Sequence, residues 1–130
     1  MNKENTNLLF EKYPNLFPNG SKVNPMESLM VYGFECGDGW INLIDKLCSD
    51  ITNLKTECMV VQVKEKFGGL RFYTEGTSNE VFDLIRKAEE DSFNICEICG
   101  ESGKLIDFHG WMMVRCNAHK NQRNKHENKN

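Results

Sequence analysis

Residues 60–73 read VVQVKEKFGGLRFY, and this stretch decides the fold. Apolar and polar residues alternate on both sides of a glycine pair, as in two strands joined by a tight turn. Gly68 and Gly69 suit the two central positions of such a turn, because both positions require a positive φ. This turn would pair Phe67 with Leu70. The sequence therefore predicts an antiparallel hairpin at the centre of a small sheet.

The polar face of this hairpin is a candidate ligand-binding surface. It carries three cations and an aromatic ring: Lys64, Lys66, Arg71 and Tyr73. The predicted register pairs Lys64 with Tyr73. Three cations beside a ring can bind a phosphate or a base. The same residues are also typical of an ordinary solvated face, so both interpretations stay open.

Glu65 interrupts the apolar face of the hairpin. A carboxylate in that position needs a partner, because burial disfavours its charged form. We expect a structural partner, such as a helix end or an arginine. A catalytic role and a bulge that turns Glu65 outward are the alternatives.

Two helices are predicted, one on each side of the hairpin in the sequence. Apolar residues recur in steps of three and four over residues 40–54 and again over residues 79–92. Asp38 is expected to cap the first helix, and Thr77 with Glu80 has capping-box spacing at the start of the second. The predicted fold class is therefore α+β, a small sheet with a central hairpin packed by two helices.

The C-terminal part of the chain carries a metal-ligand pattern. Two pairs of candidate ligands each have two intervening residues: Cys96 and Cys99, then Cys116 and His119. Three thiolates and an imidazole at this spacing can surround a tetrahedral Zn²⁺ ion. Gly100 supplies the left-handed turn that a zinc knuckle commonly needs. The sequence predicts Zn²⁺ as a cofactor, although the spacing could also be accidental.

The residues between the two ligand pairs predict a finger. Residues 105–108 and 111–114 indicate two short strands joined at His109 and Gly110, and a helix could begin near Cys116. Knuckle, hairpin and helix in this order make a treble-clef-like zinc finger. Such a short insertion needs bound metal for its stability. We expect His109 to be a turn residue, with a role as a fifth candidate ligand as the alternative.

Treble clefs also occur in HNH nucleases, which need a general-base histidine, a further histidine or asparagine and a divalent ion. Only six residues lie between His109 and Cys116, which leaves no room for the usual asparagine-bearing segment. We therefore expect a structural zinc site, with a nuclease as a weaker alternative.

Residues 35–40, ECGDGW, are a second candidate site. Cys36 precedes a predicted helix, where a thiolate can become nucleophilic. However, no histidine has a context that suggests a base, and Asp38 opposes thiolate formation. We expect a structural turn in which Trp40 anchors the packing, and we predict no catalytic residue; enzyme activity stays open as the weaker alternative.

The N-terminal region is expected to form a strap around this body. All three prolines lie in the first 25 residues, and a short helix through residues 8–10 should end before Pro14. Residues 30–34 indicate a possible strand. The predicted organisation is a body over residues 1–93, a finger over 94–120 that belongs to the same domain, and a disordered basic tail over 121–130.

Composition places the chain among ordinary globular proteins. It has 130 residues with 39% hydrophobic and 27% charged residues, enough for one domain. The formal net charge is −3, which does not favour a dedicated nucleic-acid binder. No apolar run could span a membrane, and no secretory signal is predicted. Six cysteines without an export signal indicate reduced thiols in the cytoplasm.

Three blocks together resemble a family of small phage and prophage proteins without an assigned biochemical function. These blocks are GFECGDGWINLIDKLC over residues 33–48, the hairpin stretch at 60–73, and the CEICG…GW…CNAH ending. The resemblance covers roughly residues 8–119 and implies expression in the cytoplasm of a bacterial host. It supplies no catalytic residues. We expect a non-enzymatic binder of a host or phage protein, acting in host takeover or counter-defence. The alternative is a nucleotide or nucleic-acid binder that uses the basic hairpin face.

Overall fold

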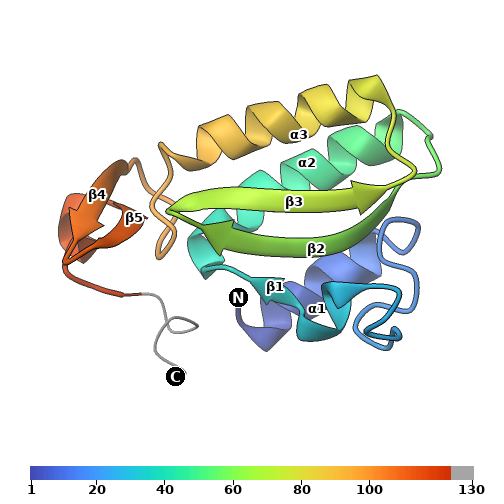
Figure 1. Cartoon of the computed structure of the whole chain (residues 1–130), viewed down its shortest axis with the longest axis horizontal. Coiled ribbons are helices and arrows are strands. Elements are labelled where there is room, and N and C mark those ends of the chain that lie inside the picture. The colour runs from blue at the N-terminus through green and yellow to red at the C-terminus, as the bar shows by residue number, and fades with distance from the viewer. Residues whose placement is uncertain (124–130) are drawn as a thin grey trace.

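The computed structural model describes residues 1–123 and confirms an α+β fold with a three-stranded sheet. The strands are β1 (Phe34–Glu35), β2 (Met59–Lys66) and β3 (Gly69–Glu75), in the order β1-β2-β3. β1 runs parallel to β2, and β2 runs antiparallel to β3. Figure 1 shows the long β2–β3 hairpin between two helices on one side and the N-terminal segment on the other.

The turn of the central hairpin lies one residue earlier than predicted. Phe67 and Gly68 are its central residues, with φ of 53° and 90°, so the predicted pairing of Phe67 with Leu70 is wrong. A Cβ on Gly69 would lie 2.4 Å from Cζ of Phe93. Gly69 is therefore needed for close packing against Phe93 and not for the turn.

The corrected register shifts every cross-strand pair by two residues. Lys64 lies opposite Arg71, and Tyr73 lies opposite Gln62, so the predicted pairing of Lys64 with Tyr73 is wrong. Because side chains alternate with a period of two, this shift leaves residues 62–66 and 70–73 on their predicted faces. An irregularity between Val60 and Gln62 interrupts the far end of the hairpin.

The two predicted helices are present as α2 (Ile41–Asn53) and α3 (Asn79–Ser92). Their apolar faces pack together and against the sheet, and they bury eight side chains: Ile44, Leu47, Cys48, Ile51, Val81, Ile85, Ala88 and Ser92. α3 also covers the outer edge of β3. The backbone N–H of Leu70 donates to Ser92 Oγ at 3.0 Å, and that of Phe72 donates to Glu89 Oε2 at 3.0 Å. This cover leaves the edge less open to pairing with another strand.

Both predicted helix caps need correction. Ser78 caps α3 by accepting the N–H of Val81, in place of the predicted Thr77 and Glu80 capping box. Asp38 lies in a 3₁₀ turn before α2, which has no side-chain cap. Its carboxylate instead accepts the backbone N–H of Asn2 at 2.7 Å, at the start of α1 (Lys3–Lys12).

The N-terminal segment packs on the sheet through aromatic rings. The ring centroids of Phe10, Phe17 and Phe34 lie 5.3–5.4 Å apart. The strand predicted over residues 30–34 is largely wrong, because residues Leu29–Tyr32 form a 3₁₀ helix and only Phe34 reaches β1. Gly33 ends that helix with a φ of 70°, which redirects the chain into the sheet.

The finger contains the predicted hairpin, formed by β4 (Lys104–Phe108) and β5 (Trp111–Arg115). His109 and Gly110 are its central turn residues, as predicted, with φ of 52° and 89°. Within residues 1–123, however, β5 is followed by a 3₁₀ helix (Asn117–His119) and no α-helix. The treble-clef expectation is therefore not confirmed. Residues 121–123 are described, whereas the rest of the predicted tail lies outside the described residues.

Candidate metal centre

The four predicted ligands meet at one point. Their ligand atoms all lie within 4.8 Å of one another: Cys96 Sγ, Cys99 Sγ, Cys116 Sγ and His119 Nδ1. The two Sγ atoms of Cys99 and Cys116 are 3.7 Å apart, and Cys96 Sγ is 3.9 Å from His119 Nδ1. Metal–sulfur bonds of about 2.3 Å in a tetrahedron require sulfur–sulfur distances of about 3.8 Å. The group can therefore hold a tetrahedral metal ion.

Local backbone geometry places the first ligand pair. Gly100 has a φ of 84° and donates its N–H to the carbonyl of Cys96 at 2.9 Å, which closes the knuckle. His109 is not part of the group and lies in the hairpin turn, where its ring contacts Phe108. The structure thus brings together the four predicted ligands and leaves out the fifth candidate.

The environment of Cys96 favours a thiolate. Burial alone would raise the pKa of Cys96, but nearby backbone N–H groups, first those of Cys116 and Cys99, lower it to about 7. Backbone donors stabilise the charged form of a thiol. A metal ligand must be deprotonated, so this environment supports metal binding near neutral pH.

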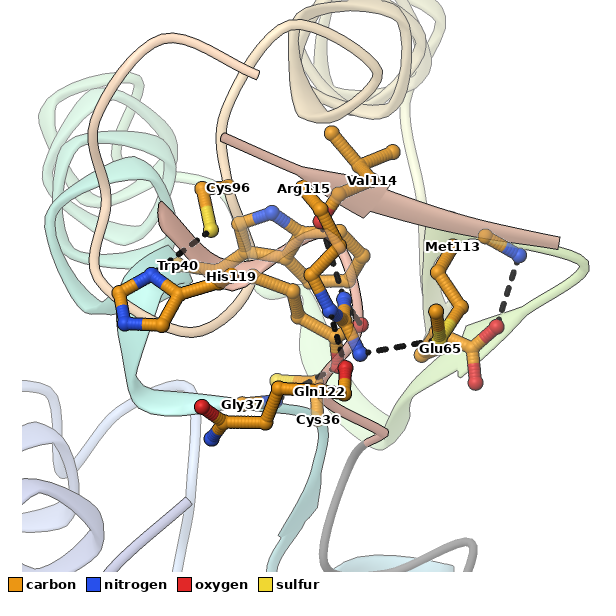
Figure 2. A network of polar contacts seen from close by, with 12 residues as sticks. Cys36, Gly37, Trp40, Glu65, Cys96, Met113, Val114, Arg115, His119 and Gln122 are labelled. Atoms are coloured by element: carbon orange, nitrogen blue, oxygen red, sulfur yellow. Dashed lines mark hydrogen bonds and ion pairs between the residues drawn. The ribbon is translucent and has the colours of Figure 1, made fainter. Parts of the chain in front are cut away.

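Two charged residues that sequence reasoning missed lie directly beside the ligands. Glu97 follows Cys96, Arg115 precedes Cys116, and both side chains are fully buried. Arg115 Nη1 lies 3.7 Å from Glu97 Oε1, so this ion pair links the two pairs of candidate ligands. Figure 2 shows Arg115 between Val114, Met113 and Gln122, and its Nε donates to the carbonyl of Gln122 at 2.7 Å. A charged residue adjacent to a ligand was the only sequence signal for this pair.

The ECGDGW segment, residues 35–40, is hydrogen-bonded to the residues on either side of Cys96. The N–H of Gly37 donates to Glu97 Oε2 at 2.7 Å, and the N–H of Gly39 donates to the Glu97 carbonyl at 2.8 Å. The indole N–H of Trp40 donates to the carbonyl of Ile95 at 3.0 Å. The expectation of a structural turn with Trp40 as its anchor agrees with these contacts.

The glycines of this segment permit the close contact. A Cβ on Gly39 would lie 2.1 Å from the carbonyl oxygen of Cys96, and one on Gly37 would lie 2.2 Å from that of Glu97. Neither glycine has a positive φ among the described backbone angles. Both glycines are therefore needed to leave space for the backbone around Cys96 and Glu97, and the segment packs closely against the first pair of candidate ligands.

Cys36 lies in the same segment without the properties of a nucleophile. Its side chain is buried, and its pKa is raised, first by that burial and then by the negative charge of Glu97. The pKa of Cys48 is raised mainly by burial as well. Neither environment favours a reactive thiolate.

The structure brings the four predicted ligand-binding residues of the basic hairpin face together only in part. Lys64 and Arg71 are cross-strand neighbours, and Lys66 lies nearer the turn beside Gly69. Tyr73, which is 39% exposed, lies one row further from the turn. Glu35 on β1 is the other neighbour of Lys64 and adds a negative charge to this face. Ligand binding by these residues stays a prediction.

Glu65 has a structural partner, as expected, in the backbone of the hairpin turn. Its Oε2 accepts the backbone N–H of Gly68 at 2.7 Å and so closes the hairpin turn. Asp107 acts in the same way in the finger, where its Oδ1 accepts the N–H of Gly110 at 2.8 Å. Each carboxylate lies three residues before the glycine whose N–H it accepts.

Comparison with models of protein families, with curated proteins and with solved structures found no significant match to this chain. Among the described residues, no helix is both long and apolar enough to cross a membrane. The class supported by the fold and the site is therefore an α+β domain with a Cys₃His group that can hold a metal ion.

Proposed function

We propose that the metal is Zn²⁺ and that its role is structural. The observation that carries this proposal is the convergence of three thiols and one imidazole within 4.8 Å. Three thiolates with one imidazole are a donor set typical of structural zinc sites. Four protein ligands also fill a tetrahedral site, so no position is left for a water or a substrate. This closed site supports a function other than metal-assisted catalysis.

Zinc content tests the metal assignment. Purified wild-type protein should contain one zinc per chain by elemental analysis, and Cys99→Ser should lose most of it, because three ligands bind zinc more weakly than four. Cys58→Ser is the matched control, since Cys58 is a buried cysteine outside the group. Equal zinc content in Cys99→Ser and wild type would contradict the assignment.

We further propose that the chain is a non-enzymatic binder of a host or phage protein in the cytoplasm of a bacterium. Its origin in a phage or prophage is inferred from the resemblance of the three sequence blocks. The closed metal site and the buried Cys36 thiol support a binding role, because the two strongest candidates for chemistry are both used to hold the fold. Action in host takeover or counter-defence is the corresponding biological proposal.

Nucleotide or nucleic-acid binding is the second candidate. It is supported by the side-by-side placement of Lys64 and Arg71 on an accessible face. Titration with single-stranded oligonucleotides at two salt concentrations tests it, because contacts to phosphate weaken steeply as salt rises. Salt-sensitive binding that is lost in Lys66→Glu with Arg71→Glu would favour this candidate over a protein partner.

A further inference from the structure

Phe67 combines two features that are unusual for a large apolar residue on a protein surface. Its side chain is 71% exposed at the tip of the β2–β3 hairpin. Its φ of 53° is in the left-handed region, which a bulky residue rarely adopts. The ring therefore gains little from burial, while the turn holds the backbone of Phe67 in a conformation that is unfavourable for a side chain of this size. Asparagine, aspartate or glycine would satisfy the turn better.

The contacts that hold the turn are made by the neighbours of Phe67. The N–H of Gly68 is bonded to Glu65, and Gly68 lies against the finger, where a Cβ would be 2.6 Å from Cδ1 of Leu105. These contacts involve the neighbours of Phe67 and not its ring. An exposed, strained side chain that makes none of these contacts points to a role outside the fold.

The surroundings of Phe67 define what it could contact. Leu105 is 42% exposed and packs against Gly68, the residue after Phe67, so the tip carries exposed apolar side chains from both hairpins. The Nζ of Lys66 lies 5.6 Å from the centroid of the Phe67 ring. Lys64 and Arg71 follow on the same two strands, and among residues 1–123 the three cations form no ion pair. We call Phe67, Leu105 and Lys66 the tip patch.

We propose that the tip patch is the partner-binding surface and that Phe67 inserts into an apolar pocket of a protein whose rim carries carboxylates. This inference rests on the proposed function as a protein binder and names its surface. Exposed aromatic anchors carry much of the binding free energy in protein interfaces. The cations match an acidic rim, which also guides association. A nucleic acid fits less well, because the chain carries a net charge of −3 and Glu35 lies beside Lys64.

Cross-linking from the tip provides the first test. Benzoylphenylalanine replaces Phe67 in one zinc-loaded protein and Phe82 in the other, and each is irradiated in cells of the native host. Phe82 is a matched control because it is 50% exposed on α3, away from the tip. We expect one protein to be cross-linked from position 67 and not from position 82, through a segment rich in aspartate or glutamate.

The second test uses the cross-linked protein after purification. Phe67→Asn should weaken its binding about tenfold or more, while Phe82→Asn should change it less than about twofold. Lys66→Glu with Arg71→Glu should also weaken binding. The melting temperature of Phe67→Asn should equal or exceed that of wild type, because asparagine tolerates the left-handed turn. This combination separates a binding role from a structural one.

The outcomes distinguish the surface from the function. If a partner is cross-linked only from position 82, or binds Phe67→Asn as tightly as wild type, the tip patch is wrong and the binding function stands. A different result is that no protein is cross-linked from either position, while an oligonucleotide binds the wild type and binds Phe67→Asn more weakly. In that case the tip patch binds a nucleic acid, and the proposed protein partner is wrong. If neither proteins nor oligonucleotides bind, both proposals are wrong.

Discussion

A buried carboxylate lowers stability unless it is paired and hydrogen-bonded, and Glu97 is the residue in which this requirement connects three parts of the chain. Its side chain accepts the N–H of Gly37 and lies beside Arg115, while its backbone follows the ligand Cys96. Arg115 in turn precedes the ligand Cys116. The pair therefore couples the ECGDGW segment to both halves of the metal centre.

Replacing Glu97 with glutamine tests this coupling. Glu97→Gln keeps an acceptor for Gly37 but removes the buried negative charge that lies 3.7 Å from the Arg115 guanidinium, so we expect a loss of about 3 kcal/mol in the free energy of unfolding. Urea unfolding of the zinc-loaded protein measures it. The exposed Glu101 provides a control, and Glu101→Gln should change stability by less than about 0.5 kcal/mol. An equal effect of the two variants would contradict the role assigned to Glu97.

At the scale of elements, α1 is bound to α2 by Asp45. Lys12 Nζ lies 2.7 Å from Asp45 Oδ1, and the Tyr13 hydroxyl donates to the Asp45 carbonyl at 3.0 Å. Hydrogen bonds from Lys12 and then Tyr13 lower the pKa of Asp45 below its usual value. Because the folded pKa is the lower one, this stabilisation is present above the unfolded pKa and is lost as pH falls through the folded pKa.

The stability of Asp45→Asn should therefore depend on pH in a specific way. At pH 7 the variant should be less stable than wild type. The difference should shrink as pH falls below the unfolded pKa of about 3.9, and it should be lost once pH is below the lower folded pKa and Asp45 is protonated in both states. Thermal melting at a series of pH values measures the difference. Asp50→Asn removes a surface pair with Lys46 and should show a smaller difference at pH 7. A difference in melting temperature between Asp45→Asn and wild type that stays constant down to pH 2 would contradict the role assigned to the Asp45 carboxylate.

The contact between the ECGDGW segment and the knuckle is also a property of elements. A methyl group at Gly39 would overlap the Cys96 carbonyl at 2.1 Å, so Gly39→Ala must separate the two segments. We expect a loss of more than about 3 kcal/mol and weaker zinc retention. Gly110→Ala is the control, because nothing lies within 4 Å of its Cβ and only its φ of 89° opposes the change. Similar losses in both variants would show that the contact is not required.

Local patterns predicted the regular elements well. The apolar spacing over residues 40–54 and 79–92 gave both long helices, and the alternation over 60–73 gave the hairpin. The ligand spacing also predicted which four side chains converge into a group that can hold a metal ion. These features depend on residues close together in the sequence, which is why periodicity reveals them.

Features that depend on distant residues were missed. Gly69 was assigned to the turn because its contact with Phe93 lies 24 positions away. The pairing of Glu97 with Arg115 was not predicted, because the two residues are far apart in the sequence and the local sequence of each is typical of an exposed charge. Turn position and buried charge pairs are decided by tertiary packing, which overrides local preference.

At the scale of the whole molecule, the finger and the body form one connected structure. Trp40 is fully buried in the core of the body and donates its indole N–H to Ile95, the residue before the first metal ligand. Gly39 donates to Glu97, the residue after it. The metal centre is therefore bonded to the core from both sides of Cys96. Metal binding should contribute to the stability of the body as well as that of the finger.

Chelation of the metal tests whether metal binding stabilises the body as well as the finger. Trp111→Phe removes the exposed tryptophan of the finger, so that Trp40 alone reports on the core. Removing zinc from this variant with a strong chelator should shift the Trp40 emission to longer wavelength and lower the temperature of a single melting transition, and added zinc should restore both. The physical reason is that loss of the ion frees the knuckle whose backbone holds Trp40 in place. An unchanged Trp40 emission after complete zinc loss would mean that the body folds independently of the metal, and the coupling of the ECGDGW segment to the metal centre would then be wrong.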